Sequence, residues 1–301
     1  MDTRQLRYFL DLCETEHLTR SAANLFITQS TLSHALRQLE DSLGVALFDR
    51  VGRGLRLSQA GRLFRDYASR ALHELEAGRM ALDDLGALRS GCVTVGVIPS
   101  YMTALLPAAI ARFHAEHPGV TLLVRELRAD AIHTELSAGR LDLGISFDDP
   151  QRRDVLAQPL LTERLLLMVP AGHAWHGRAT LPASALHALP CILQPRSFVT
   201  RRLLDAALAT RGAVPQVVME LDTVAALLQT SAHTGLPTVV PERAAAGAPA
   251  ALQAVRVVHP TPRRTAVILR RGDAGLSRAA TRFVQAVREA MQHMPTGPQG
   301  A

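Results

Sequence analysis

The side chains best suited to chemistry lie between residues 28 and 37. Hydroxyl, amide, imidazole and guanidinium groups alternate there with apolar residues, and the first acidic side chain after them is Glu40. Donor-rich side chains on one helix face form hydrogen bonds with base edges and phosphates in the major groove of DNA. We therefore expect this segment to bind DNA through Thr28, Gln29, Ser30, Thr31, Ser33, His34 and Arg37.

A second set of candidate residues lies where predicted strands are followed by helices. Hydroxyls and free backbone N–H groups at the start of a helix form a site for anions. Simple helix capping is the alternative for each Ser or Thr in this set. Because ligands of open α/β sheets bind at the carboxyl ends of the strands, we predict a small-molecule site with these candidates: Ser100, Tyr101, Thr103, Ser146, Phe147, Phe198, Thr200 and Arg201.

Residues for catalysis or metal binding do not form a recognisable set. His173 and His176 are close in sequence, but a zinc site needs further ligands and a surface loop is the favoured interpretation. The sequence contains no nucleophile elbow, phosphate-binding loop or dinucleotide fingerprint. We expect no enzyme, no cofactor and no metal. An enzyme that uses a two-lobed cleft is the alternative, and turnover assays would decide.

Two helices must position the DNA-contacting side chains. Thr19 and Thr28 are each predicted to cap a helix N-terminus. On the second helix an apolar stripe lies opposite the polar face, at spacings typical of a helix, and consists of Leu32, Ala35, Leu36, Leu39 and Leu43. A short helix, a turn and an amphipathic helix indicate a helix-turn-helix. An ordinary two-helix corner is the alternative.

A hairpin and a long helix are predicted next. Residues 50–57 have the pattern of a short wing, in which Arg50 and Arg53 are expected to contact the DNA backbone or the minor groove. Residues 58–88 contain no proline and predict one helix of about 46 Å, with Ser58 as its cap. Because its apolar stripe is too long to be buried by the preceding residues, we expect a homodimer through this helix. Its two heads would suit half-sites about 34–36 Å apart, or a multiple of that.

From residue 92 the pattern changes to alternating strands and helices. Strands are predicted at 92–98, 120–127, 141–147, 165–170, 191–193, 217–221, 238–240 and 265–270. Helices are predicted at 104–117, 129–138, 181–189, 200–211, 223–233 and 276–291, with a turn at 99–103. This alternation favours a parallel, doubly wound sheet. The strand that returns at the end predicts two lobes joined by two crossings.

Two parts of the sequence resemble one family. The run Ala22-Ala23-x-Leu25-x-Ile27-Thr28-Gln29-Ser30-x-Leu32-Ser33-x-x-Leu36-Arg37-x-Leu39-Glu40, continued by Leu43, Gly44, Leu47, Phe48, Arg50, Arg53, Leu57, Ala60 and Gly61, resembles the DNA-binding signature of LysR-type transcriptional regulators. Residues 139–145 and 169–173 are similar to landmarks of the effector domain of that family, which has the type 2 periplasmic binding-protein architecture. The resemblance covers essentially the whole chain. It suggests the subgroup of cyanate-operon regulators.

The resemblance implies a sequence-specific DNA-binding transcriptional regulator controlled by a small-molecule effector between two lobes. It implies that the wing reaches phosphates and the adjoining minor groove, and that the effector contacts Ser100, Thr103, Phe147 and Thr200. It also implies double-stranded promoter DNA as a partner and a dimer of dimers, a homotetramer, with RNA polymerase as a further candidate partner. An architectural DNA binder with a vestigial ligand domain is the alternative, which a ligand screen would test.

Composition sets limits on these expectations. All 33 basic residues are arginine, and the +6 net charge arises within residues 90–301, which favours an anionic small ligand there. Three well-separated cysteines, no signal-peptide pattern and no membrane-length apolar run predict a cytoplasmic protein. We expect a winged helix-turn-helix domain at 1–58, a linker and dimerisation helix at 59–89, a two-lobed effector domain at 90–293 and a disordered tail at 294–301.

Overall fold

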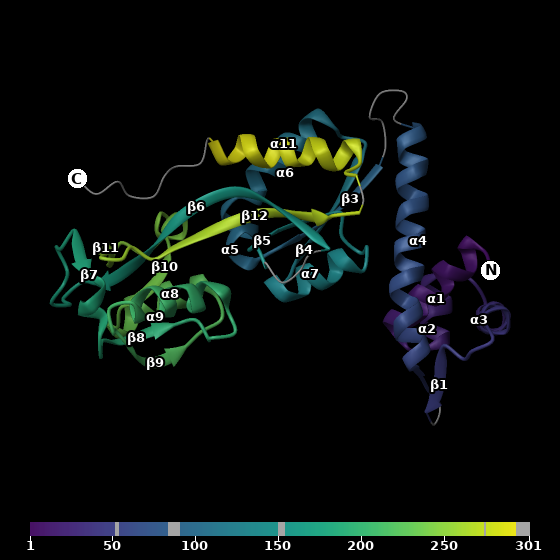
Figure 1. Cartoon of the computed structure of the whole chain (residues 1–301), viewed down its shortest axis with the longest axis horizontal. Coiled ribbons are helices and arrows are strands. Elements are labelled where there is room, and N and C mark those ends of the chain that lie inside the picture. The colour runs from purple at the N-terminus through teal and green to yellow at the C-terminus, as the bar shows by residue number, and fades with distance from the viewer. Residues whose placement is uncertain (52–53, 84–90, 150–153, 274, 293–301) are drawn as a thin grey trace.

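The computed structural model describes residues 1–51, 54–83, 91–149, 154–273 and 275–292. They form an N-terminal head, a long helix and a larger C-terminal domain (Figure 1). The predicted fold class, a helix-turn-helix head followed by an α/β domain, is confirmed. The tail expected at 294–301 and the candidate DNA contact Arg53 lie outside the described residues. The bounds of the four predicted segments stay predictions.

The head contains three helices and a hairpin, namely α1 (Thr3–Thr15), α2 (Leu18–Asn24), α3 (Gln29–Leu43), β1 (Phe48–Val51) and β2 (Gly54–Leu57). Thr28 caps α3 as predicted, because its side-chain oxygen accepts from a first-turn N–H group. Gly44 ends α3 at φ 70°, a left-handed conformation that glycine adopts without steric cost. The prediction that Thr19 caps α2 is wrong. His17 is the cap, since its imidazole accepts from a backbone N–H group, and Thr19 lies within the helix.

The apolar side of α3 packs into the core of the head. Leu32 and Leu39 of α3 have no exposed surface. Phe9 of α1 lies at the centre of the core, with ring centroids 5.8 Å from Phe48 and 5.3 Å from Phe64. Because α3 is fixed from behind by close packing, its polar side has a defined orientation toward solvent.

The long helix α4 (Gln59–Asp83) has three different faces. One packs on α1, and a second lies against the C-terminal domain of the same chain, where Asp66 pairs with Arg140 at 3.0 Å and Glu74 with Arg271 at 3.2 Å. Ser58 accepts from a first-turn N–H group of α4, as a cap does. The third face exposes large apolar side chains, namely Leu63, Tyr67 and Leu75. The predicted homodimer contact requires an exposed apolar face of this kind. Residues 84–88, which were predicted to continue the helix, lie outside the described residues.

The C-terminal domain has two lobes, which we call lobe I and lobe II. Lobe I contains β3 (Gly91–Val97), α5 (Pro99–Ala104), α6 (Leu106–Glu116), β4 (Val120–Glu126), α7 (Ala129–Ser137), β5 (Leu143–Ser146), β12 (Arg263–Arg271) and α11 (Arg278–Gln292). Lobe II contains β7 (Thr180–Pro182), a 3-10 turn (Ala183–Leu186), β8 (Pro190–Leu193), α8 (Val199–Ala209), β9 (Gln216–Glu220), α9 (Val224–Thr234), β10 (Thr238–Pro241), α10 (Glu242–Ala245) and β11 (Leu252–Val258).

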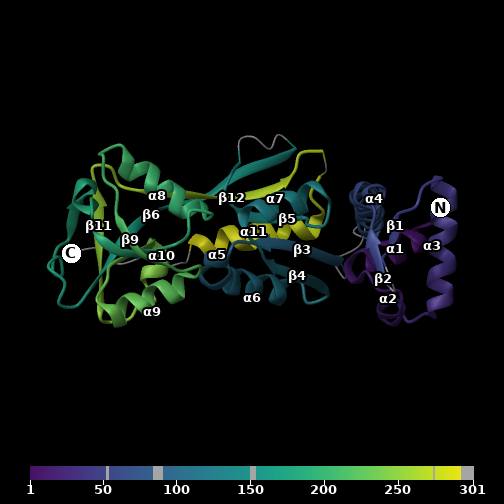
Figure 2. The same ribbon diagram turned by 90° about the horizontal axis from the view of Figure 1, so that it is seen from below.

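One strand, β6 (Val155–Pro170), runs through both lobes (Figures 1 and 2). Its first part pairs with β12 of lobe I, and its last part pairs with β10 and β11 of lobe II. The chain returns from β11 to β12, so the lobes are joined by two crossings, as predicted. In lobe I, β3 pairs in parallel with β4 and β5. In lobe II, β8 pairs in parallel with β9 and β10. Strand β12 is antiparallel to both of its neighbours, β5 and β6.

Several predicted elements differ from the structure. The segment 99–103, predicted as a turn, belongs to helix α5. Pro99 can begin this helix because the N–H groups of a first turn have no partner within the helix, so the N–H that proline lacks is not needed there. The single helix predicted at 104–117 therefore divides at Leu105. The helix predicted at 181–189 is a strand and a 3-10 turn, since Pro182 interrupts the helical pattern. Strand β6 begins ten residues before the predicted 165, and β11 was not predicted.

Candidate functional site

The polar side of α3 is open to solvent. Thr28, Gln29, Ser30, Thr31, His34 and Arg37 are exposed, and Ser33 is half-buried. Arg37 Nε donates to the carbonyl of Ser33 at 3.3 Å, and a ring nitrogen of His34 lies 3.0 Å from the amide nitrogen of Gln38. These contacts orient side chains without burying them. Each of the seven predicted residues on α3 is therefore accessible to a macromolecule.

A groove between α3 and the wing collects four of the predicted DNA contacts. Gln29, Ser33 and Arg37 of α3 line it together with Arg50 of β1, in a space of about 380 Å³. The Thr19 hydroxyl donates to Gln29 Oε1 at 3.3 Å, which orients the amide so that its NH₂ group is free to donate. Thr28, Ser30, Thr31 and His34 lie outside this groove.

Two carboxylates also lie in the groove, where they hold the wing. Glu40 accepts from the backbone N–H of Leu47 at 2.7 Å, and Glu16 accepts from that of Leu57 at 3.1 Å. Hydrogen bonds to backbone N–H groups occupy these oxygens. The acidic side chains of the groove therefore fix the position of β1 and β2 relative to α3.

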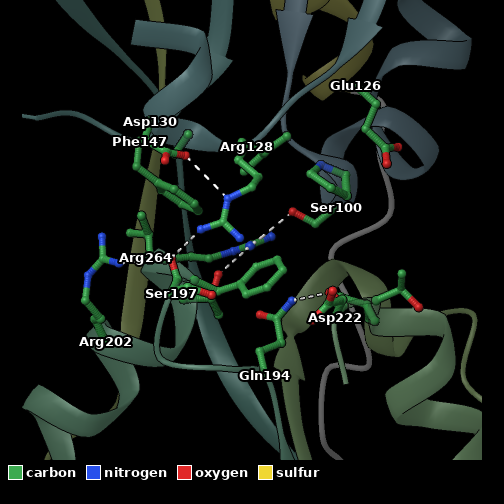
Figure 3. Close-up of a pocket in the computed structure, with 18 of the residues that line it drawn as sticks. Ser100, Glu126, Arg128, Asp130, Phe147, Gln194, Ser197, Arg202, Asp222 and Arg264 are labelled. Atoms are coloured by element: carbon green, nitrogen blue, oxygen red, sulfur yellow. Dashed lines mark hydrogen bonds and ion pairs between the residues drawn. The ribbon is translucent and has the colours of Figure 1, made fainter. Parts of the chain in front are cut away.

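A cavity of about 310 Å³ lies between lobe I and lobe II (Figure 3). Lobe I lines it with residues of α5, of the loop after β4 and of the start of α7, and lobe II with the loops that precede α8 and α9. Five of the eight predicted candidates are among the lining residues: Ser100, Thr103, Phe147, Phe198 and Thr200. The strand ends of the two lobes thus meet at one pocket, in the place that the sequence indicated.

Arg264 of β12 forms the floor of this pocket. Its Nη2 lies 2.7 Å from Glu163 of β6, and both side chains are 3% exposed. Its Nη1 donates to Ser100 Oγ of lobe I and to Thr200 Oγ1 of lobe II, both at 3.1 Å (Figure 3). The guanidinium also lies 5.6 Å from the centre of the Phe147 ring. One buried cation therefore contacts both lobes at the same time.

Helix N-termini converge on the pocket. Ala129, Val199 and Val224, the first residues of α7, α8 and α9, all line it. No side chain caps α7 or α8, so backbone N–H groups of their first turns keep a free donor position. The aligned peptide dipoles place partial positive charge at these ends. The pocket is therefore suited to a ligand group that accepts hydrogen bonds.

Three predicted candidates do not line the pocket. Tyr101 is 1% exposed and donates to Glu163 at 2.8 Å, and burial raises the pKa of its hydroxyl. Ser146 has no exposed surface. Arg201 is 5% exposed, and its Nε pairs with Asp205 at 2.9 Å. Helix periodicity accounts for Tyr101 and Arg201, since neighbours on a helix point to different sides, whereas Ser146 belongs to the buried strand β5.

Several lining residues were not predicted from the sequence. They are Ile98, Pro99, Glu126, Arg128, Ala129, Asp130, Gln194, Ser197, Val199, Arg202, Asp222, Thr223, Val224, Ala225 and Arg264. Arg128, Gln194 and Asp222 lie in loops between predicted strands and helices, so their position was a usable signal. Arg264 was not recognisable, because its place at the pocket follows from the pairing of β12 with β6.

Cys13, Cys191 and His173 each have surroundings that suit a structural role. Burial raises the pKa of Cys13 to about 12 and that of Cys191 to about 11, which keeps both thiols protonated at neutral pH. His173 accepts from the backbone N–H of Trp175 at 3.2 Å. Within the ranges that the structure describes, no group of three His, Cys, Asp or Glu side chains could hold a metal ion.

Comparisons with known proteins give the family. Residues 3–62 match the bacterial regulatory helix-turn-helix protein, lysR family, and residues 86–292 match the LysR substrate binding domain. The chain is 26% identical to a hydrogen peroxide-inducible genes activator of Haemophilus influenzae, covering 99% of each chain.

Two solved structures have a fold similar to that of this chain. A full-length OxyR variant from Pseudomonas aeruginosa is 22% identical with a TM-score of 0.77, covering 100% of this chain and 99% of that one. CbnR in complex with its target DNA is 25% identical with a TM-score of 0.58, covering 96% and 99% of the two chains. At 22% identity, the similarity to the OxyR variant shows the fold alone.

The family matches together span almost all of the described chain. In the described ranges, every helix is too short or too polar to cross a lipid bilayer. The cyanate-operon subgroup is not shown by these comparisons and stays a prediction. The chain belongs to the LysR family of DNA-binding transcriptional regulators, whose members combine a helix-turn-helix with an effector-binding domain and are not a family of enzymes.

Proposed function

We propose that α3 and the wing bind promoter DNA with sequence specificity. Exposed donors along α3 suit base edges, and Arg50 of β1 suits phosphates or the minor groove. A bidentate contact of Arg37 with guanine would contribute about 1–3 kcal/mol of discrimination. The remaining proposed DNA contacts are Thr28, Gln29, Ser30, Thr31, Ser33, His34 and Arg53, the last of which lies outside the described residues.

The pocket between the lobes is the proposed effector site, and the effector carries an anionic group. Ser100 and Thr200 carry this proposal. Because both hydroxyl oxygens accept from Arg264, each hydroxyl hydrogen is directed elsewhere and can be donated to a ligand. Free N–H groups at the start of α8 add further donors. A carboxylate, or another group with negatively charged oxygens, satisfies this donor set.

Effector binding is proposed to change the angle between the lobes. Arg264 contacts lobe I through Ser100 and lobe II through Thr200, so a ligand that engages both hydroxyls favours one lobe arrangement. The free energy that couples two such sites is typically about 1–3 kcal/mol. Asp66 and Glu74 of α4 contact lobe I directly, which gives the head a mechanical connection to the effector domain.

We further propose a homodimer through α4 that pairs into a dimer of dimers. Leu63, Tyr67 and Leu75 form an exposed apolar face on this helix, and exposed apolar faces of this kind favour association with another chain. RNA polymerase is proposed as an additional partner of the DNA-bound form. Since promoter DNA lies in the bacterial cytoplasm, the proposed function implies that location.

A thermal-shift screen of the full-length chain with small carboxylates tests the effector site. At least one carboxylate is expected to raise the Tm of the unchanged chain, and Thr200→Val is expected to lose that response while keeping its affinity for a promoter fragment. Thr210→Val serves as the control, because the Thr210 hydroxyl donates to the carbonyl of Ala207, away from the pocket. A chain that no ligand stabilises would favour the architectural DNA binder instead.

A further inference from the structure

The charges around the pocket do not suit an effector that is only an anion. Of the guanidiniums that line it, Arg264 is neutralised by Glu163 at 2.7 Å, and Arg128 faces Asp130 at 3.5 Å (Figure 3). These two cations already have counter-charges. Of the three lining guanidiniums, only that of Arg202 is left without a carboxylate partner among the described residues.

The unpaired charges of the lining are mainly negative. Glu126 and Asp222 have no ion-pair partner within the part of the chain that the structure describes. Arg202 donates to the carbonyl of Ser197 at 3.1 Å, and among the same described residues it has no carboxylate partner. Two unpaired carboxylates thus stand against one guanidinium, so the side chains of the lining alone give a purely anionic ligand no net positive charge.

These charges are separated in space. Glu126 ends β4 of lobe I, and Asp222 lies between β9 and α9 of lobe II. Figure 3 shows both on one side of the pocket and Arg202 on the opposite side, with Ser100 and Arg264 between them. Both carboxylates are exposed to solvent in this lobe arrangement, and the proposed change in the angle between the lobes would remove water from both if it brings them together. A positively charged ligand group offsets this desolvation cost.

The walls between the charged groups are apolar. Ile98 and Phe147 belong to lobe I, and Phe198 and Val224 belong to lobe II. The guanidinium of Arg128 lies 5.3 Å from the centre of the Phe198 ring, so that ring face already has a cation. The cavity of about 310 Å³ is at the small end of ligand pockets, which span about 300–1,000 Å³. A compact ligand with an apolar body fits these walls.

We infer that the effector is an amino carboxylate of about the size of one amino acid. Its carboxylate accepts from Ser100, Thr200 and the start of α8, and its ammonium lies between Glu126 and Asp222. This inference rests on the proposed effector site and adds the ligand class to it. It also explains why the pocket combines convergent donors with unpaired carboxylates on one side.

Three matched sets of probes test this inference on the full-length chain. L-leucine and L-phenylalanine carry both charges, 4-methylpentanoate and 3-phenylpropanoate lack the amine, and 3-methylbutylamine and 2-phenylethylamine lack the carboxylate. Tm shifts and calorimetric titrations are measured at equal concentrations. At least one amino acid is expected to bind, and both of its single-charge counterparts are expected to bind at least about tenfold more weakly.

Variants assign the ammonium contact. Glu126→Gln and Asp222→Asn are each expected to raise the Kd of the amino acid about tenfold, with the affinity for its carboxylate counterpart unchanged or increased, because a repelling negative charge is removed. Asp148→Asn is the matched control, because Asp148 is exposed, follows Phe147 and does not line the pocket.

Three results would overturn the amino-carboxylate inference. They are a carboxylate probe that binds as tightly as its amino acid, Gln and Asn variants that keep full affinity, and a panel in which no probe binds. The underlying site is tested separately by Thr200→Val. If a carboxylate probe binds as tightly as its amino acid and that variant abolishes its binding, the effector site stands and only the ligand class is wrong. If it affects no bound probe, the site itself is wrong.

Discussion

Removing one partner of the Arg264–Glu163 pair is expected to destabilise the C-terminal domain strongly. Both side chains are 3% exposed, with Nη2 and Oε1 2.7 Å apart. Glu163 also accepts from the Tyr101 hydroxyl at 2.8 Å and the Arg243 N–H at 3.1 Å. Arg264→Met leaves the buried carboxylate with neutral donors only, and Glu163→Gln leaves a buried guanidinium without a counter-charge.

The expected size of the effect follows from this burial. Breaking a buried ion pair by removing one partner costs about 3–5 kcal/mol, because the other charge stays desolvated. The double variant Arg264→Met/Glu163→Gln removes both charges, so its loss should be smaller than the sum of the single losses. Residues in direct contact couple by about 0.5–3 kcal/mol. Since domains are typically stable by about 5–15 kcal/mol, each single loss is readily measurable.

Urea unfolding followed by tryptophan fluorescence measures these losses. The chain has one tryptophan, Trp175, which packs against the core of lobe II. Arg112→Met is the control, since Arg112 is 46% exposed and its pair with Glu289 lies at the surface, where such pairs contribute about 0–1 kcal/mol. Single variants that lose no more than this control, or a double variant whose loss equals the sum, would refute the role given to the buried pair.

Three further predictions concern the head, the long helix and the thiols. Arg37→Ala should weaken promoter binding by about 1–3 kcal/mol in fluorescence anisotropy, and unchanged affinity would remove Arg37 from the interface. Leu75→Asp should shift sedimentation toward a smaller species, because it places a charge in the apolar face of α4; an unchanged distribution would exclude this face. Cys191 should react slowly with iodoacetamide until the pH approaches its raised pKa of about 11, and rapid labelling in the folded chain at neutral pH would contradict its burial.

Local patterns were sufficient to predict the head. The cap at Thr28 and the apolar stripe of α3 each depend on residues within or next to one helix. Thr19 was predicted wrongly because two cap-forming side chains lie close together and the imidazole of His17 takes that role. Pro99 at the start of α5 was a local signal as well, and it was interpreted as a turn.

The pocket was predicted only in part, for a physical reason. Ser100 and Thr200 were found because helix starts after strands are visible in sequence. Tyr101 and Arg201 follow them directly and were included with them, although helix geometry turns them away from the lining. Arg264 meets Glu163 only through the register of two strands far apart in the chain, which no local pattern contains.

Selection of binding sites from a random pool of duplex DNA by the full-length chain tests the central claim most directly. The polar side of α3 is predicted to enrich a two-fold symmetric sequence, with half-sites about one helical turn or a multiple apart. Replacing Ser33 and Arg37 together with alanine should abolish the enrichment. A pool that stays random with the unchanged chain, or the same motif enriched by the double variant, would contradict the claim.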